Sequence, residues 1–198
     1  RGAETVSEIV EEAARKNIKF LTLFAFSTEN WNRPKQEVNL LMKLLVSSLK
    51  NEFSRLNKNK IKLCSIGDLN SLPNSVKDEL MFVIEKTKKN KKMVLTLALN
   101  YGAKEEIIEA VKTISSKVKN SIISPEKVDE STIINHLYTK NLPPVDLLIR
   151  TSGEERISNF LLWQIAYAEL YFTKTLWPDF KKEDLQKALI NYKKRERR

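Results

Sequence analysis

Residues 20–34 read FLTLFAFSTENWNRP, an apolar run followed at once by polar side chains, an arginine and a proline. The apolar run belongs to a segment, residues 18–26, that has the length of a buried strand. Pro34 suits the first turn of a helix, and apolar residues recur every three or four positions from Val38 to Leu56. The stretch therefore predicts a strand, a polar loop and a long helix in succession.

The same order recurs along the rest of the chain. Further apolar runs of strand length occupy residues 61–66, 93–99, 145–149 and 169–173, and segments of helical period separate most of them. Strands that alternate with helices indicate a parallel sheet with crossover helices. We therefore expect residues 1–198 to form one α/β domain, with a central, mostly parallel sheet flanked by helices.

The composition excludes several classes of protein. Hydrophobic residues make up 41% of the chain and charged residues 30%, which is typical of a folded protein and not of a disordered one. The single histidine, His136, excludes multi-histidine zinc centres, so a bound metal must take oxygen ligands. No apolar stretch approaches the ~20 residues of a membrane span. The net charge of +10 favours anionic partners: nucleic acid, phosphorylated small molecules or an acidic membrane surface.

Polar segments follow four of the predicted strands directly. They read STENWNR (residues 27–33), GD (67–68), NYG (100–102) and RTSGEER (150–156). Ligands of open parallel sheets bind beyond the carboxyl ends of the strands, so we expect these loops to meet at one edge of the sheet. We call this edge the rim.

The rim carries residues suited to an anionic ligand. Arg33, Arg150 and Arg156 suit a pyrophosphate, because a guanidinium group offers paired donors that match two phosphate oxygens. The alternative is that these arginines form surface ion pairs with neighbouring glutamates. Glu29 and Glu169 are candidate ligands of a hard cation bound together with a pyrophosphate. Neither of the usual glycine-rich nucleotide-binding motifs occurs.

These segments, in this order, resemble the cis-prenyltransferase family and are most similar to bacterial undecaprenyl diphosphate synthases. The resemblance extends through residues 146–164, ELYF (169–172) and WPDF (177–180). It implies a homodimeric, Mg²⁺-dependent enzyme that condenses isopentenyl diphosphate onto an allylic diphosphate, usually farnesyl diphosphate. The implied product is a long cis-polyprenyl diphosphate, such as undecaprenyl diphosphate for the lipid carrier of cell-wall synthesis. The all-helical chain elongators use DDxxD motifs, which this chain lacks.

The resemblance also assigns roles to individual residues. It places the isopentenyl pyrophosphate on Arg150, Arg156 and Ser158, with Ile157 between them. Its substrate-binding loop comprises Phe26, Ser27, Thr28, Glu29, Trp31 and Arg33, and it makes Glu169 a magnesium ligand. Asn30 matches the catalytic position commonly assigned as proton acceptor. A neutral amide is a poor base, so we expect Asn30 to orient the isopentenyl group while a pyrophosphate oxygen takes the proton.

Two further expectations follow from the resemblance. The family has a first strand and an Asp-Gly-Asn-Gly-Arg-Trp loop, which supplies a magnesium-binding aspartate, and we expect this segment upstream of Arg1. We also expect an apolar tunnel for the product between the sheet and two long helices. Its candidate walls are Leu41, Leu45, Met81 and Ile84, for each of which the alternative is ordinary core.

Two alternatives to this enzyme remain open from the sequence. A nucleic-acid-binding module is suggested by the run KTKKNKK (residues 86–92) and by the basic tail (181–198). The first run contains no aromatic residue for base stacking, and the tail contains only Tyr192. We therefore expect no nucleic-acid partner. The other alternative is a non-catalytic partner subunit, against which the retained rim argues. The basic tail and a lipid product suggest a cytoplasmic enzyme with transient contact at the inner face of the membrane.

Overall fold

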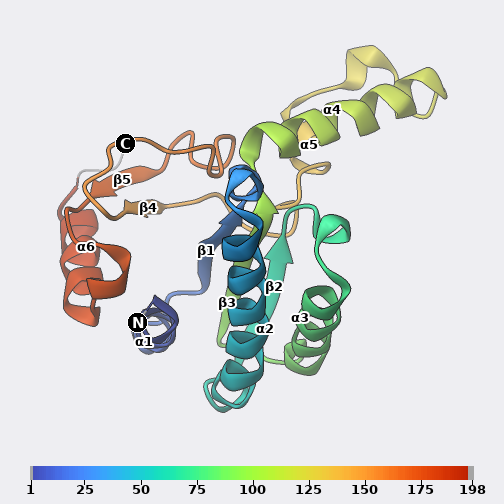
Figure 1. The fold of residues 1–198 in the computed structure, drawn as a ribbon. Coiled ribbons are helices and arrows are strands. Elements are labelled where there is room, and N and C mark those ends of the chain that lie inside the picture. Colours follow the sequence, from blue (N-terminus) through green and yellow to red (C-terminus); the bar gives the residue numbers. More distant parts are fainter. Residues whose placement is uncertain (1, 196–198) are drawn as a thin grey trace.

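The computed structural model describes residues 2–195, and strands alternate with helices along them as expected (Figure 1). The strands are β1 (Phe20–Ser27), β2 (Ile61–Ile66), β3 (Met93–Tyr101), β4 (Leu147–Arg150) and β5 (Glu169–Phe172). The helices are α1 (Gly2–Arg15), α2 (Lys35–Lys58), α3 (Asn74–Thr87), α4 (Ala103–Lys119), α5 (Glu130–Ile134) and α6 (Lys182–Lys194). The sequence did not predict α5, because one short turn of helix leaves no periodic pattern.

Every pairing between these strands is parallel, which confirms the α/β class, but the strands form two separate sheets. One sheet has the order β1-β3-β2 and the other pairs β4 with β5. The central strand β3 is buried along almost its whole length. A strand covered on both faces needs a continuous apolar run, and MVLTLALNY supplies it.

The main core lies between the three-stranded sheet and the helices that cover it. Helices α2 and α3 pack against each other and against β2, with Val76, Leu80 and Val83 of α3 fully buried. Leu41, Leu45 and Ile84 are partly buried against this core. Met81, the fourth candidate, is 49% exposed and is not among the residues packed against this core.

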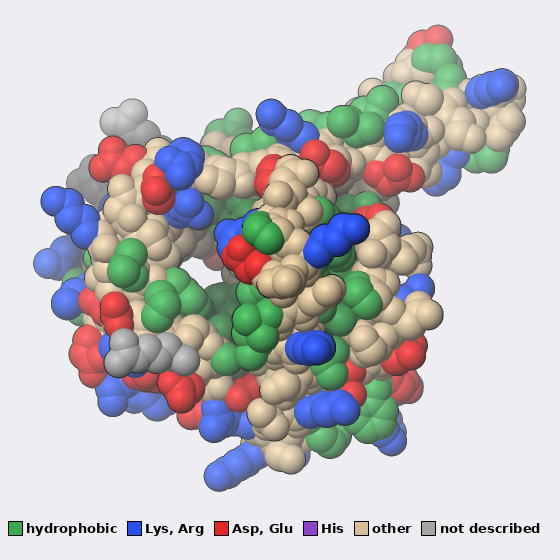
Figure 2. Space-filling model, viewed as in Figure 1, with side chains coloured by type: hydrophobic (Ala, Val, Ile, Leu, Met, Phe, Trp, Pro, Cys, Tyr) green, Lys and Arg blue, Asp and Glu red, His purple; other side chains and the backbone are tan. Residues whose placement is uncertain are grey.

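Strand β1 forms one edge of its sheet and is incompletely covered. Phe20 is 45% exposed, and Leu21, Leu23 and Phe24 are only partly buried. The β4–β5 sheet and α6 lie beside this edge (Figure 1). Between the two parts the molecule is hollowed, with hydrophobic side chains at the margin (Figure 2). An apolar edge strand of this kind is normally paired or covered.

Helix α4 and the short α5 project from the rest of the molecule (Figure 1). On α4, Ile108 and Val111 are about half exposed, and Ile122 beyond its end is 69% exposed. An apolar groove lies between α4 and the segment that leads into α5, lined by Val111, Ile114, Val118, Pro125, Val128 and Ile133. Within residues 2–195, none of the helices combines the length and the apolarity that crossing a bilayer requires.

Candidate active site

The loops after β1, β3 and β2 meet at one edge and are joined by hydrogen bonds. The indole Nε1 of Trp31 donates to Oδ1 of Asn100 over 2.7 Å. Nδ2 of Asn100 in turn donates to the carbonyl of Asp68 over 2.8 Å. The backbone N–H of Asp68 donates back to the carbonyl of Asn100 over 3.1 Å. The three loops therefore form the single rim that the strand order predicts.

Asn159 ties the loop after β4 to the same rim. Its Nδ2 donates to Oε1 of Glu29 over 3.1 Å and to Oε2 of Glu105 over 2.9 Å. Its carbonyl and Oδ1 accept the backbone N–H groups of Ala103 and Lys104, each over 2.8 Å. Asn159 was not singled out from the sequence, since an asparagine after a strand carries no signal of which loops it bridges.

The backbone of the rim is tightly turned. Asn100, Ser158 and Asn159 adopt left-handed conformations with φ of 47°, 54° and 61°. A Cβ at Gly102 would lie 2.7 Å from Nδ2 of Asn159 and 2.8 Å from Oγ1 of Thr28. The loops approach each other so closely at Gly102 that a side chain there would have to displace the side chains of Asn159 and Thr28.

The three arginines of the rim differ in what they bind. Nη2 of Arg150 is 3.5 Å from Oγ of Ser158, at the limit of a hydrogen bond, and its buried Nε has no partner. Arg33 forms an ion pair with Glu37 over 2.6 Å, and Arg156 forms one with Glu154. An unpaired buried donor is costly, so among the three rim arginines Arg150 is the one with an unmet need for an acceptor. In this structure Arg33 and Arg156 therefore form surface ion pairs, as the alternative interpretation of the sequence expected.

The residues of the loop after β1 are arranged around Glu29. Burial acts to raise the pKa of the Glu29 carboxyl, but hydrogen bonds from its own backbone amide and from Asn159, Ser27 and Thr28 outweigh it and lower the pKa below 4.5. The carboxylate therefore stays charged at neutral pH.

The remaining predicted residues of this loop differ in their accessibility. Oδ1 of Asn30 accepts a hydrogen bond from the backbone N–H of Ser27 over 3.0 Å. This bond does not use the N–H₂ group of the Asn30 amide. Phe26 is only 3% exposed and packs edge to face against Trp31, with ring centroids 5.0 Å apart. Phe26 thus lies beneath the rim and supports Trp31. Ile157, in the loop after β4, is partly buried.

The structure does not bring Glu169 to the rim. Glu169 pairs with Leu147 at the start of β4 and β5, whereas Arg150 pairs with Phe172 at their end. Three residues of strand separate the two positions by roughly 10 Å. The Glu169 carboxylate is bound by the guanidinium of Arg195.

A magnesium site is not formed by the described residues alone. Between residues 2 and 195 no three His, Cys, Asp or Glu side chains lie close enough to hold a metal ion. Glu29 already accepts hydrogen bonds from Asn159 and Thr28, and Glu169 is paired with Arg195. The donor set found here therefore does not fit Mg²⁺ without further ligands.

A buried carboxylate beneath the rim was also missed from the sequence. Glu106 is 1% exposed and accepts hydrogen bonds from the Tyr101 hydroxyl (2.6 Å), the Tyr138 backbone N–H (2.8 Å) and Nε2 of Gln164 (2.9 Å). Burial first, and then the neighbouring charge of Glu106, raise the pKa of Tyr101, which keeps its hydroxyl protonated as a donor. Glu106 thereby joins α4 to two later segments of the chain.

Comparison with known proteins places this architecture in one family. The Prenyltransf family, described as undecaprenyl diphosphate synthase, matches residues 1–198. An isoprenyl transferase of Clostridium tetani is 49% identical over 197 residues, covering all of this chain and 77% of the relative. A ditrans,polycis-undecaprenyl-diphosphate synthase of Haemophilus influenzae, specific for (2E,6E)-farnesyl diphosphate, is 47% identical over 197 residues, covering all of this chain and 82% of the relative.

A solved structure supports the same relationship. Lavandulyl diphosphate synthase from Lavandula x intermedia, crystallised in complex with dimethylallyl diphosphate, superposes with a TM-score of 0.96 at 39% identity. The match covers all of this chain and 85% of that one. Sequence and fold therefore agree, and the chain belongs to the cis-prenyltransferase family of undecaprenyl diphosphate synthases.

Proposed function

We propose that the protein condenses isopentenyl diphosphate onto farnesyl diphosphate with cis geometry and makes undecaprenyl diphosphate. The observation that carries this proposal is the unpartnered Nε of Arg150 beside Ser158, in a rim whose four loops are joined by hydrogen bonds. A guanidinium that lacks an anion at the carboxyl ends of parallel strands is suited to a pyrophosphate. The comparisons do not favour either a nucleic-acid-binding module or a non-catalytic subunit.

The reaction makes one carbon–carbon bond and breaks one carbon–oxygen bond. The terminal alkene carbon of isopentenyl diphosphate bonds to C1 of the allylic diphosphate, and the allylic pyrophosphate leaves with the electron pair of its C–O bond. The isopentenyl C2 then loses a proton to a pyrophosphate oxygen, which balances the step. Arg150, Arg156 and Ser158 hold the isopentenyl pyrophosphate in this proposal, and Arg156 must exchange Glu154 for it.

Asn30 orients the isopentenyl group in this scheme. Its Oδ1 is committed to the backbone N–H of Ser27, so the side chain is held in one direction. Its amide cannot take a proton at neutral pH, and its N–H₂ group is free to donate to a pyrophosphate oxygen. The neighbouring Ser27, Thr28, Trp31 and Arg33 complete the substrate loop.

Prenyltransferases of this family are generally metal-dependent, and we propose Mg²⁺ as the metal. A magnesium ion that binds with a pyrophosphate takes one or two protein carboxylates. We assign one of them to the aspartate of the family loop that we expect before Arg1. The other is Glu169, provided that Arg195 releases it. Removal of divalent cations with a chelator should abolish turnover, and added Mg²⁺ should restore it.

In this proposal the family's first strand pairs with the free edge of β1, on the side of the β4–β5 sheet. The free edge of β1 offers unpaired backbone groups, and Phe20 at its start is 45% exposed. A strand paired there would join the two sheets into one and would place its following loop on the rim. The natural protein should then have an intact mass above 23.0 kDa, the mass of the 198 residues.

The proposal includes a homodimer and a product tunnel. The half-exposed Ile108 and Val111 on the projecting α4 are candidates for the contact between two copies. Light scattering should give twice the mass of one chain. The growing product would lie along the apolar side chains of α2 that face the sheet, among them Leu41 and Leu45. We place the enzyme in the cytoplasm, with transient contact at the inner face of the membrane that receives its product.

One assay tests the proposed function. The protein, with the segment that we expect before Arg1 included, is incubated with radiolabelled isopentenyl diphosphate, farnesyl diphosphate and Mg²⁺, and the products are separated by size. Long products whose formation falls steeply in Arg150→Ala support the proposal. Arg55→Ala is the matched control, since Arg55 pairs with Glu11 and Glu52 away from the rim. No incorporation of label by the wild-type chain would refute the proposal.

A further inference from the structure

Three neighbouring parallel strands each begin directly after a lysine. Lys19 precedes β1, Lys60 precedes β2 and Lys92 precedes β3. The backbone N–H of Lys92 donates to the carbonyl of Lys60 over 2.9 Å, and that of Val94 donates to the carbonyl of Lys19 over 2.8 Å. Neighbouring strands lie about 4.8 Å apart, so the three lysines form a row along one edge of the sheet.

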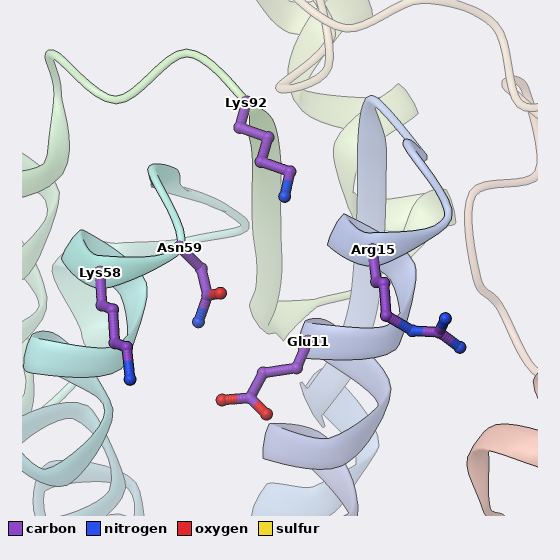
Figure 3. Close-up of a pocket in the computed structure, with 5 residues that line it drawn as sticks. All are labelled: Glu11, Arg15, Lys58, Asn59 and Lys92. Atoms are coloured by element: carbon purple, nitrogen blue, oxygen red, sulfur yellow. The ribbon is translucent and has the colours of Figure 1, made fainter.

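Further basic side chains gather around this row. A hollow of about 330 Å³ lies beside Lys92, lined also by Glu11, Arg15, Lys58 and Asn59 (Figure 3). Asn59, Lys92 and the carboxylate of Glu11 extend toward the space between α1 and α2, while the guanidinium of Arg15 turns away (Figure 3). We call the whole surface the basic edge; it comprises Arg15, Lys16, Lys19, Lys58, Lys60, Lys89, Lys91 and Lys92.

Most of these charges lack a counter-charge within the protein. Among residues 2–195, no ion pair is formed by Lys19, Lys58, Lys60, Lys89, Lys91 or Lys92. Glu12 neutralises Arg15 over 2.7 Å and lies 3.9 Å from Lys16, and Glu11 is paired with Arg55 over 3.1 Å. The basic edge therefore keeps a net positive field, which attracts an anionic partner.

The position of the basic edge distinguishes it from the rim. The rim lies at the carboxyl ends of β1, β2 and β3, and the basic edge lies at their amino ends. The helix α2 spans the distance between them, with Leu49 and Leu56 buried against the sheet. A partner on the basic edge leaves the rim open, and a prenyl chain that grows along α2 from the rim extends toward the basic edge.

An exposed aromatic side chain lies on α3, the helix that leads into Lys89, Lys91 and Lys92. Phe82 is 48% exposed, its ring lies 5.8 Å from that of Phe53, and Nζ of Lys86 is 5.6 Å from its centroid. Lysines beside an exposed aromatic ring suit the interface of a bilayer, where the ring enters the headgroup layer and the lysines meet anionic headgroups. Nucleic acid is less well matched, because Phe20, which follows Lys19, is the one exposed ring next to the described row, and successive bases would need a series of rings on which to stack.

We propose that the basic edge is a docking surface for the anionic headgroups of a membrane. The inference rests on the proposed function, because a long lipid product must be delivered to a membrane. A membrane bound at the basic edge would receive a product that extends toward this end of the molecule. Lysines near an anionic surface each strengthen binding about fivefold, so the three lysines of the row together supply roughly a 100-fold effect.

Vesicle sedimentation with the full chain tests this proposal. Binding is compared on vesicles of equal parts phosphatidylglycerol and phosphatidylcholine and on phosphatidylcholine alone, at about 0.1 M salt, where screening extends over ~10 Å. The triple variant Lys19→Gln/Lys60→Gln/Lys92→Gln should lose roughly 100-fold in affinity for the anionic vesicles. The control Lys112→Gln/Lys119→Gln/Lys127→Gln makes the same charge change on and beyond α4 and should bind like the wild type.

Three results would overturn the docking surface. The first is that the Lys19/Lys60/Lys92 triple variant binds anionic vesicles as tightly as the wild type, and the second is that the wild type binds neutral vesicles as tightly as anionic ones. The third is a marked preference of the wild type for a nucleic-acid oligonucleotide over the anionic vesicles. Prenyl transfer is measured separately in detergent solution, where the first triple variant should keep wild-type turnover. A chain that binds anionic vesicles through these lysines but transfers no prenyl group would refute the proposed function and leave the docking surface supported.

Discussion

The guanidinium of Arg195 and the carboxylate of Glu169 form an ion pair that fastens the end of α6 to the start of β5. Nη2 of Arg195 also donates to the carbonyl of Leu170 over 2.9 Å, and Nε donates to Oδ1 of Asn191 over 3.0 Å. A carboxylate held in this way is unavailable to a cation. Glu169 must therefore exchange one positive partner for another if it serves as a metal ligand.

Arg195→Gln tests this exchange. Removal of the guanidinium should lower the Mg²⁺ concentration for half-maximal activity about threefold and the free energy of unfolding by about 1 kcal/mol, since the pair is partly exposed. Glu169→Gln should instead raise the Mg²⁺ requirement. Magnesium titrations of turnover and urea denaturation measure the two effects. A Mg²⁺ requirement unchanged in both variants would leave the pair with a structural role only.

Asn30→Ala should affect turnover much more than the binding of isopentenyl diphosphate. We expect kcat to fall about 100-fold and KM to change less than about threefold, because the amide orients the group that reacts. Steady-state kinetics separate the two constants. Asn30→Asp is the matched variant, since it keeps the acceptor for the Ser27 N–H and loses the donor. Wild-type turnover in Asn30→Ala would remove Asn30 from the mechanism.

Gly102→Ala should disturb the rim while the fold persists. The added methyl group would meet Oε2 of Glu105 at 2.0 Å, and Asn159 and Thr28 at less than 3 Å. These are side-chain atoms that can move, so we expect a stability loss of about 1–2 kcal/mol and a larger loss of substrate affinity, about tenfold. Isothermal calorimetry with isopentenyl diphosphate measures the affinity. The double variant Gly102→Ala/Glu105→Ala removes the closest clash and should recover part of it.

Glu106→Ala should be among the most destabilising single changes in this part of the chain. It leaves the Tyr101 hydroxyl, the Tyr138 N–H and Nε2 of Gln164 without their shared acceptor. Unsatisfied buried donors cost about 1–3 kcal/mol each, so we expect a loss of roughly 3 kcal/mol or more in urea denaturation. Tyr101→Phe removes only one donor and should cost about 1 kcal/mol. Equal losses in the two variants would contradict this account of Glu106.

The contribution of Glu29 should depend on pH. Its pKa is lowered in the folded chain, so its stabilising effect is fully present above the ordinary value of 4.5 and is lost as the pH falls through the lowered pKa. Glu29→Gln should therefore be less stable than the wild type at pH 7, and the difference should shrink below pH 4.5. Denaturation at a series of pH values measures it. A difference that stays constant down to strongly acidic pH would show that the charge of Glu29 contributes nothing.

Local patterns predicted the elements well but not their long-range partners. The apolar run MVLTLALNY and the periodic residues after Pro34 identified β3 and α2, because strand and helix periods are properties of neighbouring residues. The burial of Glu106 could not be predicted, since its partners Tyr101, Tyr138 and Gln164 come from different segments. Its place in the first turn of α4 equally suits an exposed acidic residue.

The candidate site was predictable to a similar extent. The strand order placed the loops containing Trp31, Asn100 and Asp68 at one edge, and the hydrogen bonds between them confirm it. The pairing of Arg33 with Glu37 was not among the expected ion pairs, because Arg33 lies in the extended segment before α2 and Glu37 in the first turn of that helix. Glu169 lies away from the rim, at the start of β5. This position could not be predicted, because sequence order does not reveal which end of a short strand faces a ligand.

The hydrogen bond from Trp31 to Asn100 makes the intrinsic fluorescence of Trp31 sensitive to the state of the rim. The indole N–H donates to Asn100, which in turn donates to Asp68. Glu29, two residues before Trp31, accepts a hydrogen bond from Asn159. An anion gripped by Arg150 would reposition the segment that ends at Asn159, and the polarity around the indole would change with it. Substrate capture should therefore be readable as a change in tryptophan emission, without any label on the ligand.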